Sequence, residues 1–448
     1  MVDVVVIGAG PAGLGAASVA AGEGASVVLI DGAVRSGGQY WRHGPAGPDS
    51  GTPRRRVLER LRSRLDRVKV LMTHRVWQVS SGGDGFVVRA LAGDRDERPV
   101  VVRGATVVVA TGAHDRVVPF PGWDLPGVMT AGGAQAMLKA GGAVLGSPVA
   151  VSGTGPLLVP VAGALAAAGA DVTGVYEANR VSREAMRLVS DPARLAAAGG
   201  FAAVLSRHRV GYHPGRVVVA ARGDGRVEEV TVARVNRDWT IVSGTDRVVP
   251  CTGVAVGFGL SPQLDVARQL GCRIDTDEHG DPFVVVSATQ RTSVPGVYAA
   301  GEVTGVGGAA LSLVEGRLAG YAVTGARPPG RLLARRAGLR RFAARMSATF
   351  SVRTGWRSWL DDDTIVCRCE EVTAGAVASA VRAGGFDTRT VKLLSRAGMG
   401  YCQGRMCGAA VTALLGGSGE GNASLRRIAQ PIRMADLAAD EPDDGSTG

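Results

Sequence analysis

Apolar runs that end directly at glycine-containing turns punctuate the first two thirds of the chain. Four of them predict strands: VVVI at 4–7, TVVVA at 106–110, VAVS at 149–152 and VYAA at 297–300. Because these runs do not alternate with polar residues, they are typical of strands buried on both faces of a parallel sheet. After the first and third runs, small apolar residues continue for more than two helical turns. This strand, turn and helix order predicts an α/β fold.

The first turn, GAGPAG, has the spacing of a dinucleotide-binding turn. Its glycines Gly8, Gly10 and Gly13 permit a tight turn, close approach of a pyrophosphate to the backbone, and close packing of helix against strand. Pro11 and Ala12 complete the turn, and the following helix directs its N-terminus at the phosphates. A second strand, SVVLID, ends at Asp31, where a carboxylate can accept a hydrogen bond from a ribose hydroxyl. These elements in register predict a nucleotide site; the alternative is a glycine-rich turn without a ligand.

A second copy of the pattern begins 145 positions downstream, where VAVSGTGPLLVPVAGALAAAGADVTGVYE repeats the turn, helix and second strand. Gly153 and Gly155 repeat Gly8 and Gly10, but Leu158 replaces the third glycine. Glu177 offers an acid one position later than the repeat predicts. Two Rossmann-like units are therefore expected. NAD binding in the second unit and a degenerate turn kept as scaffold both remain open, and an acid at this place favours NAD over NADP.

Together with these two units, the segments TVVVATGAHDR and TSVPGVYAAGEVTG resemble the two-dinucleotide-domain flavoproteins of the glutathione-reductase type. The resemblance covers roughly residues 1–330 and implies FAD. It implies that the segment RSGGQ lies along the flavin and that an acid after AAG binds the ribityl chain of FAD. The ATG turn would be the point at which the chain leaves the FAD domain. The matching residues are Gly38, Gln39, Ala110, Thr111, Gly112, Gly301 and Glu302. No cysteine pair follows GGQ, which excludes the disulfide-reductase mechanism of that family.

Four of the six cysteines are crowded into two short runs, IVCRCE and GMGYCQGRMCG. Cys367 and Cys369 form C-x-C, and Cys402 and Cys407 form C-x4-C. Two predicted helical segments, broken at Gly384 and Gly385, separate the pairs and allow both to meet at loop ends. Four thiolates on tight loops suit a [2Fe–2S] cluster or tetrahedral zinc, and four uncommitted thiols are the remaining alternative.

The run as a whole resembles the [2Fe–2S] domain of the bacterioferritin-associated-ferredoxin (BFD) type. Gly400, Gly404 and Gly408 are expected to let backbone N–H groups approach the sulfurs. The nearby cations either offset the charge of the cluster or face solvent; they are Arg368, Lys392, Arg396 and Arg405. Cys251 and Cys272 stand apart in apolar surroundings and are expected in the core.

These patterns divide the chain into six segments. The expected boundaries are 1–116 and 251–330 for an FAD domain in two parts, 117–250 for an inserted NAD-like domain, 331–360 for a linker helix, 361–420 for the iron–sulfur domain, and 421–448 for an extension with a disordered end. In the linker, arginines and apolar residues alternate as in a basic amphipathic helix, which can bind a membrane surface or a partner; the default is that it packs on its own flavin domain.

Composition restricts the remaining possibilities. The formal charge is +11, but it is almost entirely arginine and no aromatic-interleaved basic stretch occurs, so no nucleic-acid partner is expected. No stretch of roughly 20 residues is free of polar or helix-breaking positions, as an integral membrane span would need. The N-terminus enters a strand pattern at once, so a cytoplasmic location is expected, with peripheral membrane contact through the basic helix as an alternative.

The segments PGWDLPGVMTAGGAQAML, GEVTGVGGAALSLVEGRLAG and QPIRMADLA narrow the resemblance to the larger subunits of hydrogen cyanide synthase, opine oxidase, and proline or hydroxyproline dehydrogenases. That resemblance implies a heteromeric enzyme acting on the CH–NH bond of an amino acid, imino acid or opine. A D-amino-acid-oxidase-like flavoprotein and a small ferredoxin-like chain are the implied partners. Trp123 is expected to anchor a domain crossing, and His114 to serve in packing or capping.

Two other functions remain open at this point. One is a self-sufficient NAD(P)H-dependent reductase that passes electrons through FAD to the cluster. The other is a non-catalytic scaffold that holds an adenine nucleotide such as ATP. No His/Asp or Tyr/Arg constellation that would bind an amino-acid carboxylate and accept a proton is evident, so no catalytic residue is assigned.

Overall fold

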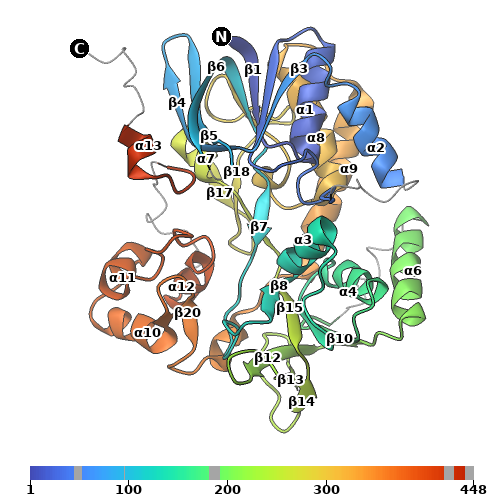
Figure 1. The fold of residues 1–448 in the computed structure, drawn as a ribbon, viewed down its shortest axis with the longest axis vertical. Coiled ribbons are helices and arrows are strands. Elements are labelled where there is room, and N and C mark those ends of the chain that lie inside the picture. Colours follow the sequence, from blue (N-terminus) through green and yellow to red (C-terminus); the bar gives the residue numbers. More distant parts are fainter. Residues whose placement is uncertain (45–52, 95, 181–191, 418–427, 439–448) are drawn as a thin grey trace. The chain divides into compact units, whose positions relative to one another are not determined.

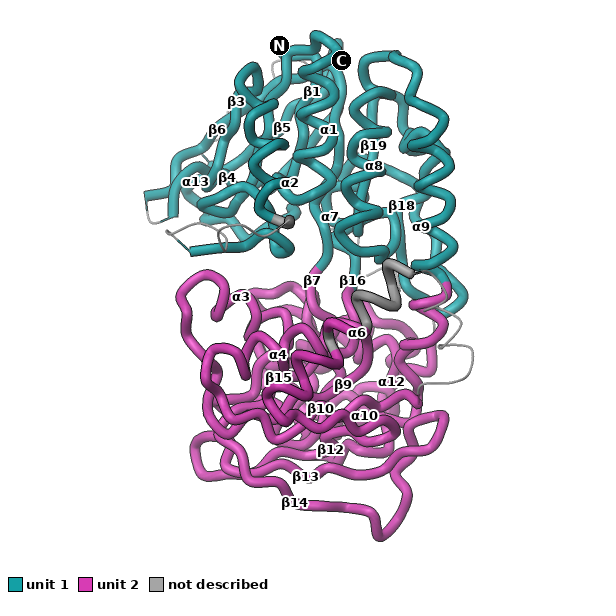
Figure 2. The backbone as a smooth tube through the Cα atoms, turned by 90° about the vertical axis from the view of Figure 1, so that its right-hand side faces the viewer, with its two compact units in different colours: residues 1–113, 261–344, 424–448 teal, residues 114–260, 345–423 magenta. Residues whose placement is uncertain are grey.

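The computed structural model describes residues 1–44, 53–94, 96–180, 192–417 and 428–438. The chain forms two compact units (Figure 2). Unit 1 comprises residues 1–113, 261–344 and 424–448, of which 428–438 are the described part of the last segment. Unit 2 comprises residues 114–260 and 345–423. The chain passes between the units at the short strands β7 (Ala113–Asp115) and β16 (Leu260–Pro262) and within helix α9.

A seven-stranded sheet forms the centre of unit 1 (Figure 1). Its order is β3-β2-β1-β6-β5-β4, with β19 also paired to β6. The strands are β1 (Val2–Ile7), β2 (Val27–Asp31), β3 (Val68–Met72), β4 (His74–Gly82), β5 (Gly85–Ala92), β6 (Arg98–Val109) and β19 (Val297–Ala299). Val4 and Val6 pack into one core and Val5 and Ile7 into another, which confirms that the first apolar run is buried on both faces.

Helices cover the sheet of unit 1, and two of them pack at very short range. Between α1 (Pro11–Gly22) and α8 (Gly308–Val323), a Cβ on Gly316 would lie 1.9 Å from the carbonyl oxygen of Ala12, so only glycine fits. The other elements of this unit are α2 (Pro53–Arg62), α7 (Asp265–Gln269), α9 (Gly330–Thr349), α13 (Met434–Ala438), the 3-10 helix η1 (Glu302–Thr304), β17 (Ile274–Thr276) and β18 (Pro282–Val284).

Unit 2 contains a five-stranded parallel sheet in the order β11-β10-β9-β15-β8. Its strands are β8 (Val128–Thr130), β9 (Val149–Gly153), β10 (Val172–Glu177), β11 (Tyr212–Pro214) and β15 (Gly253–Gly257). Helices α3 (Ala131–Gly141), α4 (Leu158–Ala167) and α6 (Pro192–Arg207) accompany it, and β12 (Arg216–Arg222), β13 (Glu229–Arg234) and β14 (Arg247–Pro250) form an antiparallel sheet. The second Rossmann-like unit that the repeat predicts is present.

The cysteine-bearing segment belongs to unit 2 and shares a core with that unit's sheets. It consists of the 3-10 helix η2 (Thr354–Trp359), β20 (Ile365–Cys367), β21 (Val372–Thr373), α10 (Ala374–Arg382), α11 (Thr388–Ser395) and α12 (Gly408–Leu414). The two expected helical segments on either side of Gly384 and Gly385 are α10 and α11. One apolar cluster includes Val217 and Val254 of the sheets as well as Val366 and Val377 of the cysteine-bearing segment.

Tryptophans join these parts of unit 2. The Trp359 indole Nε1 donates to the carbonyl of Trp239 at 2.9 Å, and the two rings stack with centroids 6.0 Å apart. The fully buried Trp239 donates in turn to the Asn179 side-chain oxygen at 3.0 Å. Trp123 donates to the carbonyl of Ile365 at 2.5 Å, which gives this expected anchor its partner. The segment that bears the cysteines is therefore packed against, and hydrogen-bonded to, the second Rossmann-like domain.

The basic linker forms helix α9, and its unit 1 part is held by ion pairs. Arg336 and Arg340 donate to the buried carboxylate of Glu315 on α8, at 3.0 and 2.8 Å. This confirms the default expectation that the helix packs on its own flavin domain. Among the described residues, no helix combines the length and apolarity required to cross a bilayer.

Replacing Trp359 with alanine should destabilise unit 2. The change removes a buried aromatic ring and the hydrogen bond to Trp239, and loss of a buried tryptophan side chain typically costs about 3–5 kcal/mol. Differential scanning calorimetry of the full-length protein would measure the loss. Trp359→Phe is the matched variant: it keeps a ring for stacking and loses only the N–H, with an expected cost of about 1 kcal/mol. Equal effects of the two variants would contradict this role of the ring.

Candidate functional site

The first glycine turn has the close contacts that its sequence predicts. The φ of Gly8 is +106°, and a Cβ there would lie 2.2 Å from the carbonyl oxygen of Ala110. A Cβ on Gly13 would lie 1.7 Å from the Gly8 oxygen. Helix α1 begins at Pro11 with Gly10 as its N-cap and has no side-chain cap. Its first N–H groups are consequently left for a phosphate, as in other nucleotide-binding turns.

Asp31 lies against this turn. Its carboxylate accepts hydrogen bonds from the backbone N–H of Ala9 at 2.5 Å and of Ala33 at 2.7 Å. Burial raises the pKa of this carboxyl group, and the two N–H donors act in the opposite direction. Each carboxylate oxygen has a further lone pair, so a ribose hydroxyl can be accommodated beside the backbone donors.

Two further predicted segments meet the turn. A Cβ on Gly38 would lie 2.9 Å from the Cα of Gly10, and Gln39 accepts a hydrogen bond from Arg42 at 2.8 Å. The Thr111 hydroxyl donates to the carbonyl of Gln263 at 2.7 Å, and the N–H of Gln263 donates to the carbonyl of Gly112 at 2.9 Å. The ATG turn, which includes Ala110, is thus fixed to the strand that returns to unit 1.

The AAG segment adds the last predicted flavin residues. A Cβ on Gly301 would lie 2.8 Å from the Cβ of Ala12, so this segment also lies at the first turn. Glu302 accepts from the N–H groups of Gly308 at 2.7 Å and Gly307 at 3.3 Å, at the start of α8. Burial is the main influence on Glu302 and raises its pKa. The structure therefore brings the four flavin-related segments together around one turn.

A buried carboxylate that the sequence analysis missed supports this arrangement. The fully buried Glu315 accepts from the N–H of Gly301 at 3.2 Å and from the Thr304 hydroxyl at 2.9 Å. Arg336 and Arg340 of α9 supply its countercharge. The available signal was the acid in the small-residue sequence SLVEGRLAG, followed by a helix rich in arginine. A buried acid needs such partners because an unpaired buried charge is costly.

The second turn is built differently at its third glycine position. Gly153 keeps the close approach, since a Cβ there would lie 1.9 Å from the Gly257 oxygen. Leu158 is fully buried, and its Cδ2 would lie only 3.1 Å from a Cβ on Gly257. Helix α4 begins at Leu158, whereas the repeat places its start at Pro156. The replacement of glycine by leucine thus coincides with a later helix start.

Glu177 occupies the place of Asp31 in the second unit. It accepts from the N–H groups of Gly155 and Asn179, both at 2.9 Å. The register of β10 against β9 shifts between Val172 and Gly174, and this irregularity accounts for the acid standing one position late. The side chain of Glu177 is fully buried, which raises its pKa to about 7.

The four cysteines meet as two thiol pairs. Cys367 hydrogen-bonds with Cys407, and Cys369 with Cys402. Cys367 ends β20, and Cys407 precedes α12. The hydrogen bond with Cys407, more than any other influence, lowers the pKa of Cys367 to about 5 and raises that of Cys407.

Glycines shape the loops around these thiols. Gly398 donates its N–H to the Cys367 sulfur at 3.4 Å, a donor that the sequence analysis did not name. A Cβ on Gly400 would lie 2.4 Å from the Cβ of Cys369. Of the nearby cations, Arg396 pairs with Glu370 at 2.9 Å, and Arg368 donates to the Asp124 carbonyl. These two side chains have protein partners of their own.

The donor set fits a two-iron cluster. Each iron of a [2Fe–2S] cluster takes two thiolates, and the structure presents two pairs of thiols with backbone N–H groups at a sulfur. Within the described residues, no group of three or more His, Cys, Asp and Glu side chains has the arrangement of a single-ion site. Two pairs of thiolates are the ligand set that a [2Fe–2S] cluster uses.

Comparison with known proteins identifies both parts of this arrangement. Residues 2–324 match the family described as pyridine nucleotide-disulphide oxidoreductase, and residues 365–416 match the BFD-like [2Fe-2S] binding domain. The chain belongs to the pyridine nucleotide-disulphide oxidoreductase family. It is an FAD-dependent oxidoreductase with a C-terminal [2Fe–2S] domain.

Several relatives of this oxidoreductase match over nearly their full length. The hydrogen cyanide synthase subunit HcnB of Pseudomonas aeruginosa is 35% identical, with 90% of each chain covered. An opine oxidase subunit of Rhizobium meliloti is 33% identical, with 97% of each chain covered. Among solved structures, the L-proline dehydrogenase from P. horikoshii aligns with a TM-score of 0.70 at 21% identity, covering 97% of this chain and 79% of that one, which shows a shared fold.

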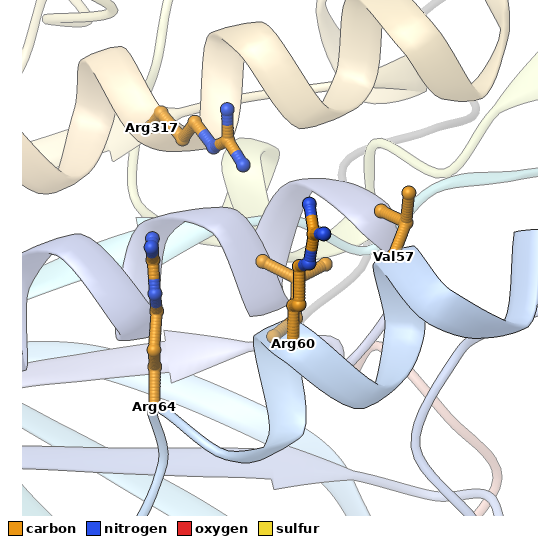
Figure 3. A pocket seen from close by; sticks show the side chains of 5 residues that line it. Val57, Arg60, Arg64 and Arg317 are labelled. Carbon is orange, nitrogen blue, oxygen red and sulfur yellow. The ribbon is translucent and has the colours of Figure 1, made fainter. Parts of the chain in front are cut away.

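A small cavity of about 140 Å³ lies elsewhere in the flavoprotein unit, beside α2 and α8. Its lining residues are Val57, Arg60, Leu61, Arg64 and Arg317, and Arg60 and Arg64 extend toward the side of Arg317 (Figure 3). Burial, followed by the neighbouring arginines, lowers the pKa of Arg317. None of the residues predicted to bind FAD lines this cavity, so it is separate from the predicted flavin turn.

Gly13→Ala should abolish FAD binding. The new methyl group would overlap the backbone oxygen of Gly8, which cannot move without opening the turn. The flavin absorbance of the purified protein would fall to background. Gly22→Ala in the same helix is the control, because nothing lies within 4 Å of a Cβ there. That variant should retain FAD, because the added methyl group meets no other atom. Full flavin content in Gly13→Ala would refute the packing argument.

The raised pKa of Glu177 predicts a stability that falls as pH rises. Because the folded-state pKa of about 7 lies above the unfolded value of 4.5, Glu177 stabilises the fold at low pH, and this contribution is lost as pH rises through about 7. Between about pH 5.5 and pH 8 the loss should be about 2 kcal/mol. Urea unfolding of wild type and Glu177→Gln at both pH values would measure it. An unchanged pH slope in the variant would exclude Glu177 as its source.

Proposed function

We propose that this protein is the electron-relaying subunit of a heteromeric dehydrogenase or oxidase that oxidises the CH–NH bond of an amino acid, imino acid or opine. The observation that carries the proposal is the presence, in one chain, of a complete flavin turn and a four-thiol cluster site. Oxidation of CH–NH to C=N releases two electrons and two protons. Bound FAD and [2Fe–2S] would supply two-electron and one-electron chemistry, respectively.

The names of the relatives support a place in a multi-subunit enzyme. Subunits of hydrogen cyanide synthase and of opine oxidase match along nearly the whole chain. The alpha subunit of a sarcosine oxidase from Corynebacterium matches 71% of this chain at 30% identity, although only 32% of that longer protein is covered. Opines and sarcosine are amino-acid derivatives with a substituted nitrogen, which favours a substrate of that class.

The residues of the flavin turn would hold the dinucleotide rather than react. The N–H groups at the start of α1 would bind the pyrophosphate, Asp31 the ribose, and the segments containing Gly38 and Gly301 would confine the rest of the cofactor. Within the described residues we identify no constellation that would bind an amino-acid carboxylate and accept a proton. We therefore assign substrate chemistry to a D-amino-acid-oxidase-like flavoprotein partner, with a small ferredoxin-like chain as a further partner.

The second turn argues against a self-sufficient NAD(P)H-dependent reductase. Leu158 fills the position where glycine permits close helix packing, and α4 begins two residues later than the repeat predicts. Glu177 accepts two N–H hydrogen bonds as Asp31 does, but it is fully buried, whereas Asp31 is only partly buried. The pyrophosphate of a nicotinamide dinucleotide would therefore find the N-terminus of α4 two residues later in the chain than the repeat predicts. We infer that this domain serves chiefly as the platform of the iron–sulfur loops.

NADH should leave the flavin of the isolated chain oxidised under anaerobic conditions, because the second turn lacks the packing glycine. Proline, hydroxyproline, glycine or an opine should bleach the flavin only when the partner flavoprotein is present. Visible absorbance spectra would follow both reactions. Rapid bleaching by NADH in the isolated chain would overturn the relay assignment in favour of a self-sufficient reductase.

Cysteine variants separate the two cofactors in the same experiment. Cys402→Ser should lose the cluster absorbance while the flavin is retained, and electron delivery to a one-electron acceptor should fall at least tenfold. Cys251→Ser in the same unit is the matched control, because this buried cysteine precedes β15 and no other cysteine is among the groups that act on it. A cluster that survives in Cys402→Ser would contradict the ligand assignment.

A further inference from the structure

Large apolar side chains are exposed around the cysteine loops. Five of them lie within 16 consecutive residues, and we call them the apolar patch: Phe386 (90% exposed), Leu393 (68%), Leu394 (52%), Met399 (46%) and Tyr401 (75%). The helix α11 that bears Leu393 and Leu394 buries Val391 on its inner side. Exposed large apolar side chains gathered in one short stretch of a folded domain indicate an interaction surface.

The patch lies next to the cluster site. Met399 follows Gly398, which donates to the Cys367 sulfur, and Tyr401 precedes Cys402. The loop between them passes so close to Cys369 that a Cβ on Gly400 would lie 2.4 Å from the Cβ of that cysteine. Cys369 is exposed, whereas Cys367 and Cys407 are buried. The apolar patch therefore adjoins Cys369, the cysteine that is exposed to solvent.

The charges of the same segment indicate what kind of partner binds. The whole cysteine-bearing stretch, residues 365–407, carries six cations and three acids, Glu370, Glu371 and Asp387. Arg396 pairs with Glu370, and the stretch keeps a net charge of +3. Asp387 caps α11 by accepting from the Thr390 N–H at 2.7 Å. An apolar centre with a basic surround is complementary to a partner that presents apolar residues within an acidic rim.

We infer that the apolar patch is the docking surface for an acidic one-electron carrier protein. The inference rests on the relay function proposed above. Lys392 stands directly beside Leu393, and lysine is depleted in the cores of stable subunit interfaces. Charged rims around small contact areas are typical of transient redox complexes. A carrier docked there would lie beside Cys369, and a bound [2Fe–2S] cluster would supply it with one electron at a time, the cluster being oxidised as the carrier is reduced.

Binding to an acidic haem protein would test this surface directly. The probe is the soluble domain of cytochrome b5, titrated calorimetrically into the oxidised full-length protein at low ionic strength. The double variant Phe386→Ser/Leu393→Ser should weaken binding at least tenfold, and Lys392→Glu should weaken it and reduce its salt dependence. The matched controls are Val248→Ser and Arg226→Glu, exposed positions of unit 2 outside residues 381–407, which should bind as wild type does.

Electron transfer supplies a second readout that needs neither substrate nor a partner flavoprotein. The full-length protein is reduced with dithionite, freed of the excess reductant and mixed with ferric cytochrome b5 in a stopped-flow instrument. The patch variants should slow haem reduction at least tenfold and leave the reaction with ferricyanide unchanged, since that small acceptor needs no docking surface. Slower ferricyanide reduction would instead indicate a damaged cluster and would overturn the inference.

Two further outcomes would also overturn the inference. Unchanged binding and unchanged haem reduction in the patch variants would exclude the surface. Loss of the partner flavoprotein from the patch variants on size-exclusion chromatography would show that a permanent subunit, not a carrier, covers the patch. Because dithionite replaces the substrate, failure of this test is distinguishable from failure of the relay function, which the NADH experiment reads separately.

Discussion

The contact between Gly8 and the carbonyl oxygen of Ala110 is the constraint on which the predicted flavin site depends. A side chain at Gly8 would come within 2.2 Å of that oxygen, so the exit strand and the first turn can meet only where a Cβ is absent. Gly38 and Gly301 likewise bring their segments against the first turn, and Gly13 packs against Gly8 within that turn. Four stretches that are distant in sequence thereby reach one point, and the α1 N-terminus stays accessible to phosphate.

Two buried glutamates illustrate how surroundings give one residue type two roles. Glu315 has two arginines and two further donors around it, so its carboxylate ties α8 and α9 to the turn containing Gly301. Glu177 has no arginine among the influences on its pKa, and burial raises that pKa to about 7. The first is an ion-paired anchor, whereas the second is a hydrogen-bonded support whose charge changes near neutral pH.

The iron–sulfur loops and the second Rossmann-like domain share one hydrophobic core. Trp239, stacked on Trp359 and hydrogen-bonded to Asn179, links the loop after Glu177 to the segment that leads into the cysteines. The Rossmann-like domain of unit 2 thus packs directly against the segment that bears the four cysteines. The loss of the third glycine at Leu158 is compatible with that use, because a scaffold needs a packed helix and no phosphate approach.

Local patterns in the sequence were sufficient to identify the two glycine turns, the strands buried on both faces, the helices on either side of Gly384 and the cysteine pairs. Each of these depends on residues close together in the chain, whose backbone freedom, periodicity or thiol chemistry can be read directly. The partners of Glu315, the shared core beneath the cysteines and the donor Gly398 depend on long-range contacts that spacing does not encode. The irregularity in β10 is of the same kind, since strand register is visible only when β9 lies beside it. The sequence by itself therefore determined which chemistry the chain can carry, and only the tertiary structure decided which side chains support it, because burial and pairing arise from segments brought together by folding.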